Sequence, residues 1–144
     1  MLVQQISVFV ENKKGRLVGV TEVLAKNNID ICAISIADTT NFGILRMIVD
    51  APALAVEELK KDGYTVSTTE VIAVEIKDQP GGLNEVLKIL RDHDISIEYL
   101  YSFVKRPAEN ALILFRVENT KKALDVLRES DVKIVSEADI YNIK

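Results

Sequence analysis

One cysteine and one histidine, the residue types that most often carry nucleophilic or metal chemistry, are present in the chain. Cys32 has no partner for an internal disulfide, and one cysteine with one histidine cannot supply the ligands of the usual zinc sites. Cys32 stands in an apolar segment without a nearby base in sequence. His93 stands between Asp92 and Asp94 at an expected helix end, where a cation is favoured. We therefore expect no catalytic residue, no metal and no cofactor.

Two glycine-containing loops are the stronger candidates for chemistry. Residues 11–17 read Glu-Asn-Lys-Lys-Gly-Arg-Leu, and residues 77–83 read Lys-Asp-Gln-Pro-Gly-Gly-Leu. Glycine lets backbone N–H groups approach a ligand closely, and the first turn of a helix offers unpaired donors and a positive dipole end to a carboxylate. Asn12 or Asp78, three residues ahead of a glycine, could accept a hydrogen bond from an ammonium group. An alternative stays open, in which these residues only shape a turn.

The sequence repeats itself. At a shift of 66, residues 6–31 align without a gap with residues 72–97, and identical pairs occur at 8 of 26 positions. Average residue frequencies predict roughly two such pairs by chance. A two-residue insertion near residues 107–110 changes the shift to 68, and the similarity then continues nearly to the end. The repeat indicates two units, residues 1–70 and 71–144, with no Gly, Pro or Ser cluster as a linker between them.

Each unit shows the same order of expected elements, strand, helix, two strands, helix, strand. Alternating apolar residues predict the strands, and apolar residues at i, i+3, i+4 and i+7, from Leu17 to Leu24 and from Leu83 to Leu90, predict the first helices. Pro52 and Asn119 are typical openings for the second helices. The expected strands lie at residues 6–11, 29–37, 44–50 and near 66 in the first unit, and at 72–77, 95–104, 111–118 and 134–140 in the second, with hairpin connections at 39–41 and 106–110.

This order predicts an α+β protein of two tandem ferredoxin-like βαββαβ units, each with an antiparallel sheet and both helices on one face. A unit of about 70 residues has a small core and two open sheet edges, which are liabilities in isolation. We therefore expect the units to pair and the chain to form a homodimer.

At the two loops the sequence resembles the ACT domains, small βαββαβ modules that bind amino acids and regulate metabolic enzymes. The stretch from Asp78 to Leu83 is similar to the family's D-x-P-G-x-L signature in full. The first loop keeps Gly15 and Leu17 but has Lys14 at the position of the proline. The resemblance covers both repeats and is greatest to stand-alone tandem ACT proteins that carry no catalytic domain.

The resemblance implies a non-catalytic regulatory module that binds a small amino acid and acts on its own association or on a metabolic enzyme. In the family the ligand lies between this loop and the second strand of a neighbouring ACT unit. The ligand-binding residues implied for this chain are Asn12, Lys14, Gly15, Arg16, Leu17, Ile31, Asp78, Gln79, Pro80, Gly81, Gly82, Leu83 and Ile97.

Other classes of function remain as alternatives. The chain could be a protein-interaction module with vestigial ligand sites, or an enzyme on a ferredoxin-like scaffold, although no nucleophile, base and orienting group can be assembled from its residues. Residues 41–43, Asn-Phe-Gly, resemble weakly the third-strand signature of RNA-recognition modules. Tyr99, Tyr101 and Phe103 alternate on one expected strand and could line a side-chain pocket or belong to the core.

Composition limits the partners further. The 144 residues include 18 Lys and Arg against 22 Asp and Glu, a net charge of −4, which offers no broad positive field to a nucleic acid. No apolar run approaches the roughly 20 residues of a membrane helix. The N-terminus lacks the features of a secretory signal. We therefore expect a cytoplasmic protein without nucleic-acid or membrane partners.

Overall fold

A computed structural model of the chain describes residues 2–11, 13–38, 41–105, 107 and 109–143. Contacts within the chain divide it into two compact units, Gln4–Thr69 and Glu70–Lys144 with Met1–Val3. The boundary falls inside one strand, β4 (Thr65–Lys77), so this strand begins in the first unit and ends in the second.

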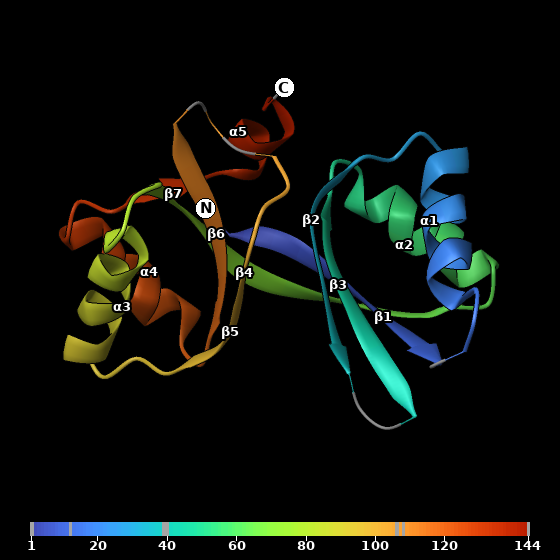
Figure 1. The fold of residues 1–144 in the computed structure, drawn as a ribbon, viewed down its shortest axis with the longest axis horizontal. Coiled ribbons are helices and arrows are strands. Elements are labelled where there is room, and N and C mark those ends of the chain that lie inside the picture. The colour runs from blue at the N-terminus through green and yellow to red at the C-terminus, as the bar shows by residue number, and fades with distance from the viewer. Residues whose placement is uncertain (1, 12, 39–40, 106, 108, 144) are drawn as a thin grey trace. The chain divides into compact units, whose positions relative to one another are not determined.

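The first unit has the predicted βαββαβ order. Its strands are hydrogen-bonded in the order β2-β3-β1-β4, and both β1 and β2 run antiparallel to β3. Helices α1 and α2 lie together on one side of these strands (Figure 1). The elements are β1 (Val3–Glu11), α1 (Arg16–Lys26), β2 (Ile31–Asp38), β3 (Phe42–Val49), α2 (Pro52–Lys61) and the first part of β4.

The second unit repeats this arrangement. Its strands are hydrogen-bonded in the order β7-β4-β6-β5, with antiparallel pairs throughout, and α3 and α4 lie together on one side of them (Figure 1). The predicted α+β class, with two ferredoxin-like units and antiparallel sheets, is therefore confirmed. The remaining elements are α3 (Gly82–Asp92), β5 (Ile97–Ser102), β6 (Asn110–Val117), α4 (Thr120–Glu129), β7 (Lys133–Val135) and α5 (Glu137–Tyr141).

Each unit has its own apolar core between sheet and helices. Equivalent positions of the repeat supply the two cores, because the same alternation of strand residues and the same helical spacing place apolar side chains on the covered face. In the first unit the core includes Ile6, Val8, Val20, Leu24, Leu45, Met47, Ala55 and Leu59. In the second it includes Ile72, Val74, Val86, Leu90, Ile113, Phe115, Ala123 and Leu127.

The second helix of each unit begins where the sequence predicts. Helix α2 begins at Pro52, as predicted. Helix α4 begins after Asn119, whose side chain accepts a hydrogen bond from the Lys122 N–H at 3.1 Å, also as predicted.

The inclusion of Leu17 in the apolar stripe of α1 was wrong. Its side chain is 45% exposed, because it lies in the first turn of α1, ahead of the buried positions Val20 and Leu24.

The last predicted strand was wrong in its second half. Strand β7 ends at Val135, and the following residues form the short helix α5. The change occurs at Ser136, whose hydroxyl accepts a hydrogen bond from the Asp139 N–H at 3.3 Å and caps the helix. Both predicted hairpin connections lie partly outside the described residues, since positions 39, 40, 106 and 108 are among those not described.

Cys32 and His93 take structural places. Cys32 is fully buried in β2. His93 ends α3 at its C-cap position, is exposed, and has its Nδ1 2.9 Å from the carbonyl oxygen of Ile89. Within the described ranges no group of three or more His, Cys, Asp or Glu side chains could hold a metal ion. Among the same residues, no helix combines the length and apolar character of a membrane span.

Candidate functional site

The first loop connects β1 to α1 and turns at a left-handed glycine. Gly15 has φ +86° and occupies the N-cap position of α1, where its missing side chain leaves the helix start without a side-chain cap. The loop is closed by its own backbone, since the Lys13 N–H donates to the Glu11 carbonyl at 2.7 Å and the Arg16 N–H donates to the Lys13 carbonyl at 3.3 Å. Asn12, a predicted ligand residue, lies outside the described residues.

The charges of the first loop are largely paired with one another. The Glu11 carboxylate lies 2.8 Å from the Lys13 ammonium and 3.3 Å from the Arg16 guanidinium. The hydrogen bond and charge of Lys13, followed by the charge of Arg16, hold the pKa of Glu11 below its ordinary value. The Arg16 guanidinium also lies 5.9 Å from the centroid of the Tyr64 ring. Glu11 therefore pairs with two of the three basic residues of this loop, and the third, Lys14, is exposed.

The second loop connects β4 to α3 and is built more tightly. Gly81 has φ +90° and occupies the N-cap position of α3, again without a side-chain cap. The Gln79 N–H donates to the Lys77 carbonyl at 2.9 Å, and the Gly82 N–H donates to the Gln79 carbonyl at 3.0 Å. A Cβ at Gly82 would overlap the carbonyl oxygen of Lys77, so only glycine permits this close approach.

Both loops present the same chemistry to a ligand. A Cβ added at Gly15 or at Gly81 would meet no heavy atom within 4 Å, so the space in front of each helix start is open. The N–H groups of Arg16 and Gly82 donate within their loops, but the next N–H groups in the first turn of each helix lack intrahelical partners, and a glycine cap offers them no side-chain acceptor. Such a place suits a carboxylate. Asp78, Gln79 and Pro80 are exposed on the rim of the second loop, and Leu83 is half-buried against the core behind it.

The two strand residues of the predicted site do not meet the loop of their own unit. In the first unit Ile31 pairs with Val49 at one end of the sheet, whereas Glu11, just before the loop, pairs with Phe42 at the other end. In the second unit Ile97 and Lys77 are separated in the same way along β6. The sheet register therefore brings together the loop residues of each unit and leaves Ile31 and Ile97 apart from them.

A hollow of about 320 Å³ adjoins the second loop. Its walls come from the end of β4, the beginning of α3 and the turn between α4 and β7. The lining combines both signs of charge with apolar side chains. The lining residues are Glu75, Ile76, Lys77, Gly82, Glu85, Val86, Ile89, Asn110, Ser130, Asp131, Val132 and Lys133. The sequence pattern singled out Gly82 among these and missed the others, because they come from four separate segments.

The first unit carries an apolar hollow of about 450 Å³. Phe9, Phe42, Ile44 and Thr65 line it. Phe9 and Ile44 are cross-strand partners in the register of β1 and β3, which places their side chains on the same face of the sheet. Phe9 is 48% exposed and Phe42 is 51% exposed, so two aromatic rings face solvent here. The sequence indicates this surface, because the alternation along β1 places Phe9 on the sheet face opposite the buried Val8 and Val10.

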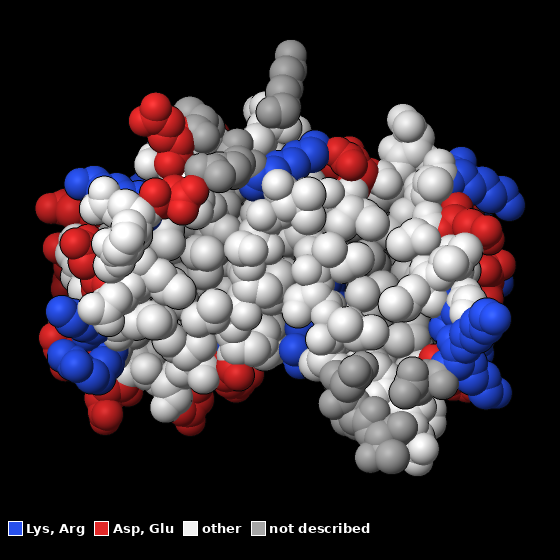
Figure 2. All heavy atoms as spheres, viewed as in Figure 1, with Lys and Arg blue, Asp and Glu red and all other residues white. Residues whose placement is uncertain are grey.

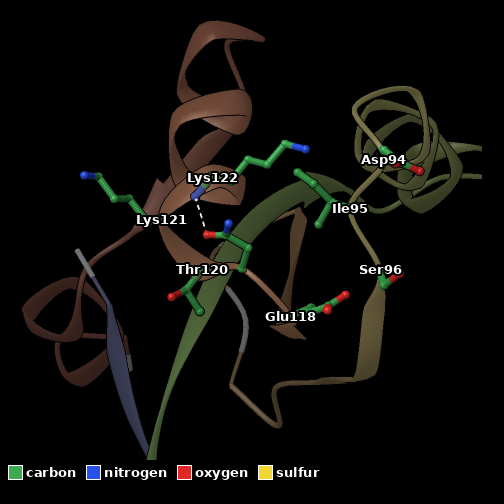
Figure 3. A pocket seen from close by; sticks show the side chains of 8 residues that line it. Asp94, Ile95, Ser96, Glu118, Thr120, Lys121 and Lys122 are labelled. Atoms are coloured by element: carbon green, nitrogen blue, oxygen red, sulfur yellow. Dashed lines mark hydrogen bonds between the residues drawn. The ribbon is translucent and has the colours of Figure 1, made fainter.

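A third hollow, of about 490 Å³, lies at the beginning of α4 (Figure 3). It forms where the turn after α3 meets the turn after β6, and the Glu118 N–H donates to the Ser96 carbonyl across this junction at 3.2 Å. Figure 3 shows Asp94 and Ser96 on one side and Lys121 and Lys122 on the other. The sequence predicted the cap of this helix and missed the hollow, which depends on the meeting of two turns.

Charges of both signs lie on the face drawn in Figure 2. Lys and Arg side chains lie there among Asp and Glu side chains and form no continuous basic stripe. A nucleic-acid interface requires such a stripe, so this face gives the RNA-binding alternative no support.

Comparison with known proteins agrees with the fold. Protein BT0572 from Bacteroides thetaiotaomicron has a solved structure that is similar over 99% of this chain and 98% of that chain, with 40% sequence identity and a TM-score of 0.93. The ligand-free regulatory subunit of aspartate kinase from Thermus thermophilus is similar in fold over 90% of this chain and 94% of that chain, with 16% identity and a TM-score of 0.63. The regulatory subunit of aspartate kinase from Thermus flavus gives 15% identity and a TM-score of 0.61 over 90% and 94% of the two chains.

The search of curated proteins returned no significant match. The family model described as "ACT domain pair" matches residues 1–144. The match therefore includes both glycine loops and both βαββαβ units. This chain belongs to the family of ACT domain pairs.

Proposed function

We propose that this ACT domain pair is a non-catalytic regulatory module that binds a small amino acid at the loops before α1 and α3. The observation that carries the proposal is the recurrence of one uncommon feature at the same place in both units. Gly15 and Gly81 each cap a helix in the left-handed conformation, with open space where a side chain would stand. An amino-acid carboxylate fits the N–H groups behind such a cap.

The remaining contacts of the ligand follow from the family resemblance. Asp78 in the second loop, and Asn12 in the first, would accept hydrogen bonds from the ammonium group of the ligand. Ile31 or Ile97 of another ACT unit would close the site from the opposite side. A ligand held in this way bridges two units and therefore favours one arrangement of them over another.

The size of this effect is enough for regulation. A ligand present at 100 times its Kd stabilises the bound form by about 2.7 kcal/mol, which changes an equilibrium between two states about a hundredfold. The structures similar in fold include two that are regulatory subunits of aspartate kinase. We propose that the present chain likewise regulates its own dimerisation or a metabolic enzyme partner.

The proposal is tested by ligand screening. Thermal unfolding of the chain is recorded with each of the twenty amino acids in turn, and each hit is titrated by calorimetry. We expect at least one amino acid to raise the melting temperature and to bind saturably. Light scattering with and without that amino acid then shows whether the oligomeric state changes. If none of the twenty binds, the proposal is wrong.

A second candidate function is association with another copy of the chain, with the loops as vestigial sites. The apolar hollow of the first unit favours it, since monomeric proteins rarely leave grouped aromatic rings in solvent. The substitution Phe42→Ser should then lower the dimer fraction in sedimentation experiments. An unchanged dimer fraction would exclude this surface.

A further inference from the structure

The hollow beside the second loop contains a largely buried carboxylate whose two partners lie at different distances. The Glu75 side chain is 12% exposed, and the Asn110 amide donates to its Oε2 at 2.7 Å. Its other partner, the ammonium of Lys133, lies 3.4 Å from Oε1, and the Lys133 side chain is 67% exposed. The amide contact is short, whereas the lysine contact is long and open to solvent. The lysine could therefore exchange Glu75 for another anion at little cost.

The rest of the lining extends this mixture of charges. The acidic residues Glu85 and Asp131 and the basic residue Lys77 also line the hollow. Ile89 is a half-buried apolar wall residue. A ligand that places a cation and an anion a few bonds apart, with a small apolar group beside them, matches this lining. A volume of about 320 Å³ lies at the lower end of the range for ligand clefts, which favours a single small molecule.

The first unit has replaced this set of residues. At the shifts that align the two units, Glu75 corresponds to Phe9, Asn110 to Phe42 and Lys133 to Thr65. These three residues line the apolar hollow of the first unit. Gly82 corresponds to Arg16, whose side chain is paired with Glu11. The same place in the fold thus carries charged residues of both signs in the second unit and is apolar in the first.

We propose that the hollow of the second unit, between β4, α3 and the α4–β7 turn, holds one free α-amino acid with a small aliphatic side chain per chain. The ammonium group of the ligand binds the Glu75 carboxylate in place of Asp78, and Lys133 moves from Glu75 to the ligand carboxylate at the beginning of α3. The aliphatic side chain packs against Ile89. This inference rests on the proposed amino-acid binding and assigns it to one pocket within one unit.

The test compares two charge-removing substitutions on the same strand. Glu75→Gln keeps the shape of the side chain and removes its charge, and Glu70→Gln makes the same change at an exposed position of β4 outside the hollow. Wild type and both variants are titrated by calorimetry with the twenty amino acids. We expect one amino acid bound per chain, about tenfold or greater weakening by Glu75→Gln, and a Kd within about twofold of wild type for Glu70→Gln.

Two further measurements keep the test decisive if Glu75→Gln unfolds. Lys133→Ala changes an exposed side chain, so it should retain the fold, which circular dichroism checks. It should also weaken binding of the amino acid. The carboxylic acid that lacks the ammonium group of the bound amino acid should bind wild type weakly and should lose nothing further in Glu75→Gln.

The outcomes separate the two proposals. If an amino acid binds wild type but Lys133→Ala, or a folded Glu75→Gln, binds it as Glu70→Gln does, the assignment to this hollow is overturned and the proposed function stands. Two equivalent sites per chain overturn the assignment as well. If no amino acid binds wild type, the proposed function and this inference are both wrong.

Discussion

Alanine at Gly81 should damage ligand binding far more than alanine at Gly63, although both changes cost the fold the same. Gly81 and Gly63 both have φ +90°, and at both positions an added Cβ would meet no heavy atom within 4 Å. The left-handed conformation costs an alanine about 1–2 kcal/mol, with no further clash at either site. Each variant should therefore unfold roughly 2–8 °C below wild type.

The two positions differ in what the new methyl group faces. At Gly81 it enters the space in front of the first N–H groups of α3, where we place the ligand carboxylate. At Gly63 it stands in the turn between α2 and β4, outside both loops. One misplaced methyl group in a binding pocket costs about 1–3 kcal/mol, so Gly81→Ala should raise the Kd about tenfold or more. Gly63→Ala should leave it unchanged.

The assay is thermal unfolding of each variant followed by calorimetric titration with the amino acid found in the screen. Gly82→Ala marks the largest expected loss of stability, because its Cβ would overlap the backbone oxygen of Lys77. It should unfold well below Gly81→Ala. Equal Kd values for the Gly81→Ala and Gly63→Ala variants would refute the argument that the left-handed glycine admits the ligand.

Two more predictions concern the first loop and its surroundings. A Cβ at Gly19 would overlap the Tyr64 hydroxyl oxygen but would lie 3.6 Å from the ring carbon that carries it. Gly19→Ala should therefore lower the free energy of unfolding, measured by chemical denaturation, by about 1 kcal/mol or more in wild type and by much less in the Tyr64→Phe background. An equal loss of stability in the two backgrounds would contradict this. Because Lys13 is the largest cause of the lowered pKa of Glu11, Lys13→Ala should raise that pKa more than Arg16→Ala in an NMR titration. A lowered carboxyl pKa stabilises the fold above the unfolded pKa, so this contribution should fade as the pH falls through the pKa of the folded state, and a reverse order of the two variants would contradict the contacts.

The fold was predictable from the sequence because local and repeated signals agreed. Alternating strands, helical stripes and caps such as Asn119 recur at one spacing, and each is decided by a few neighbouring residues. Gly15 and Gly81 were identifiable for the same reason. The repeat places both glycines between a strand and a helix, but their left-handed conformation is known only from the structure.

The parts that could not be predicted depend on distant segments. The hollow beside the second loop needs Glu75, Asn110 and Lys133, which come from three strands and meet only in the folded sheet. Leu17 has the spacing of a core residue and is exposed, because spacing fixes the face of a helix and does not tell where along the helix the sheet ends. The last strand was extended too far because Ile140, although buried, belongs to a helix.

The most direct test of the central claim is a crystal structure of the chain grown with the amino acid that raises its melting temperature most. We expect density for that amino acid at the beginning of α3, with its carboxylate within hydrogen-bond distance of backbone N–H groups in the first turn of that helix. An amino acid bound away from both glycine loops would contradict the proposed binding site.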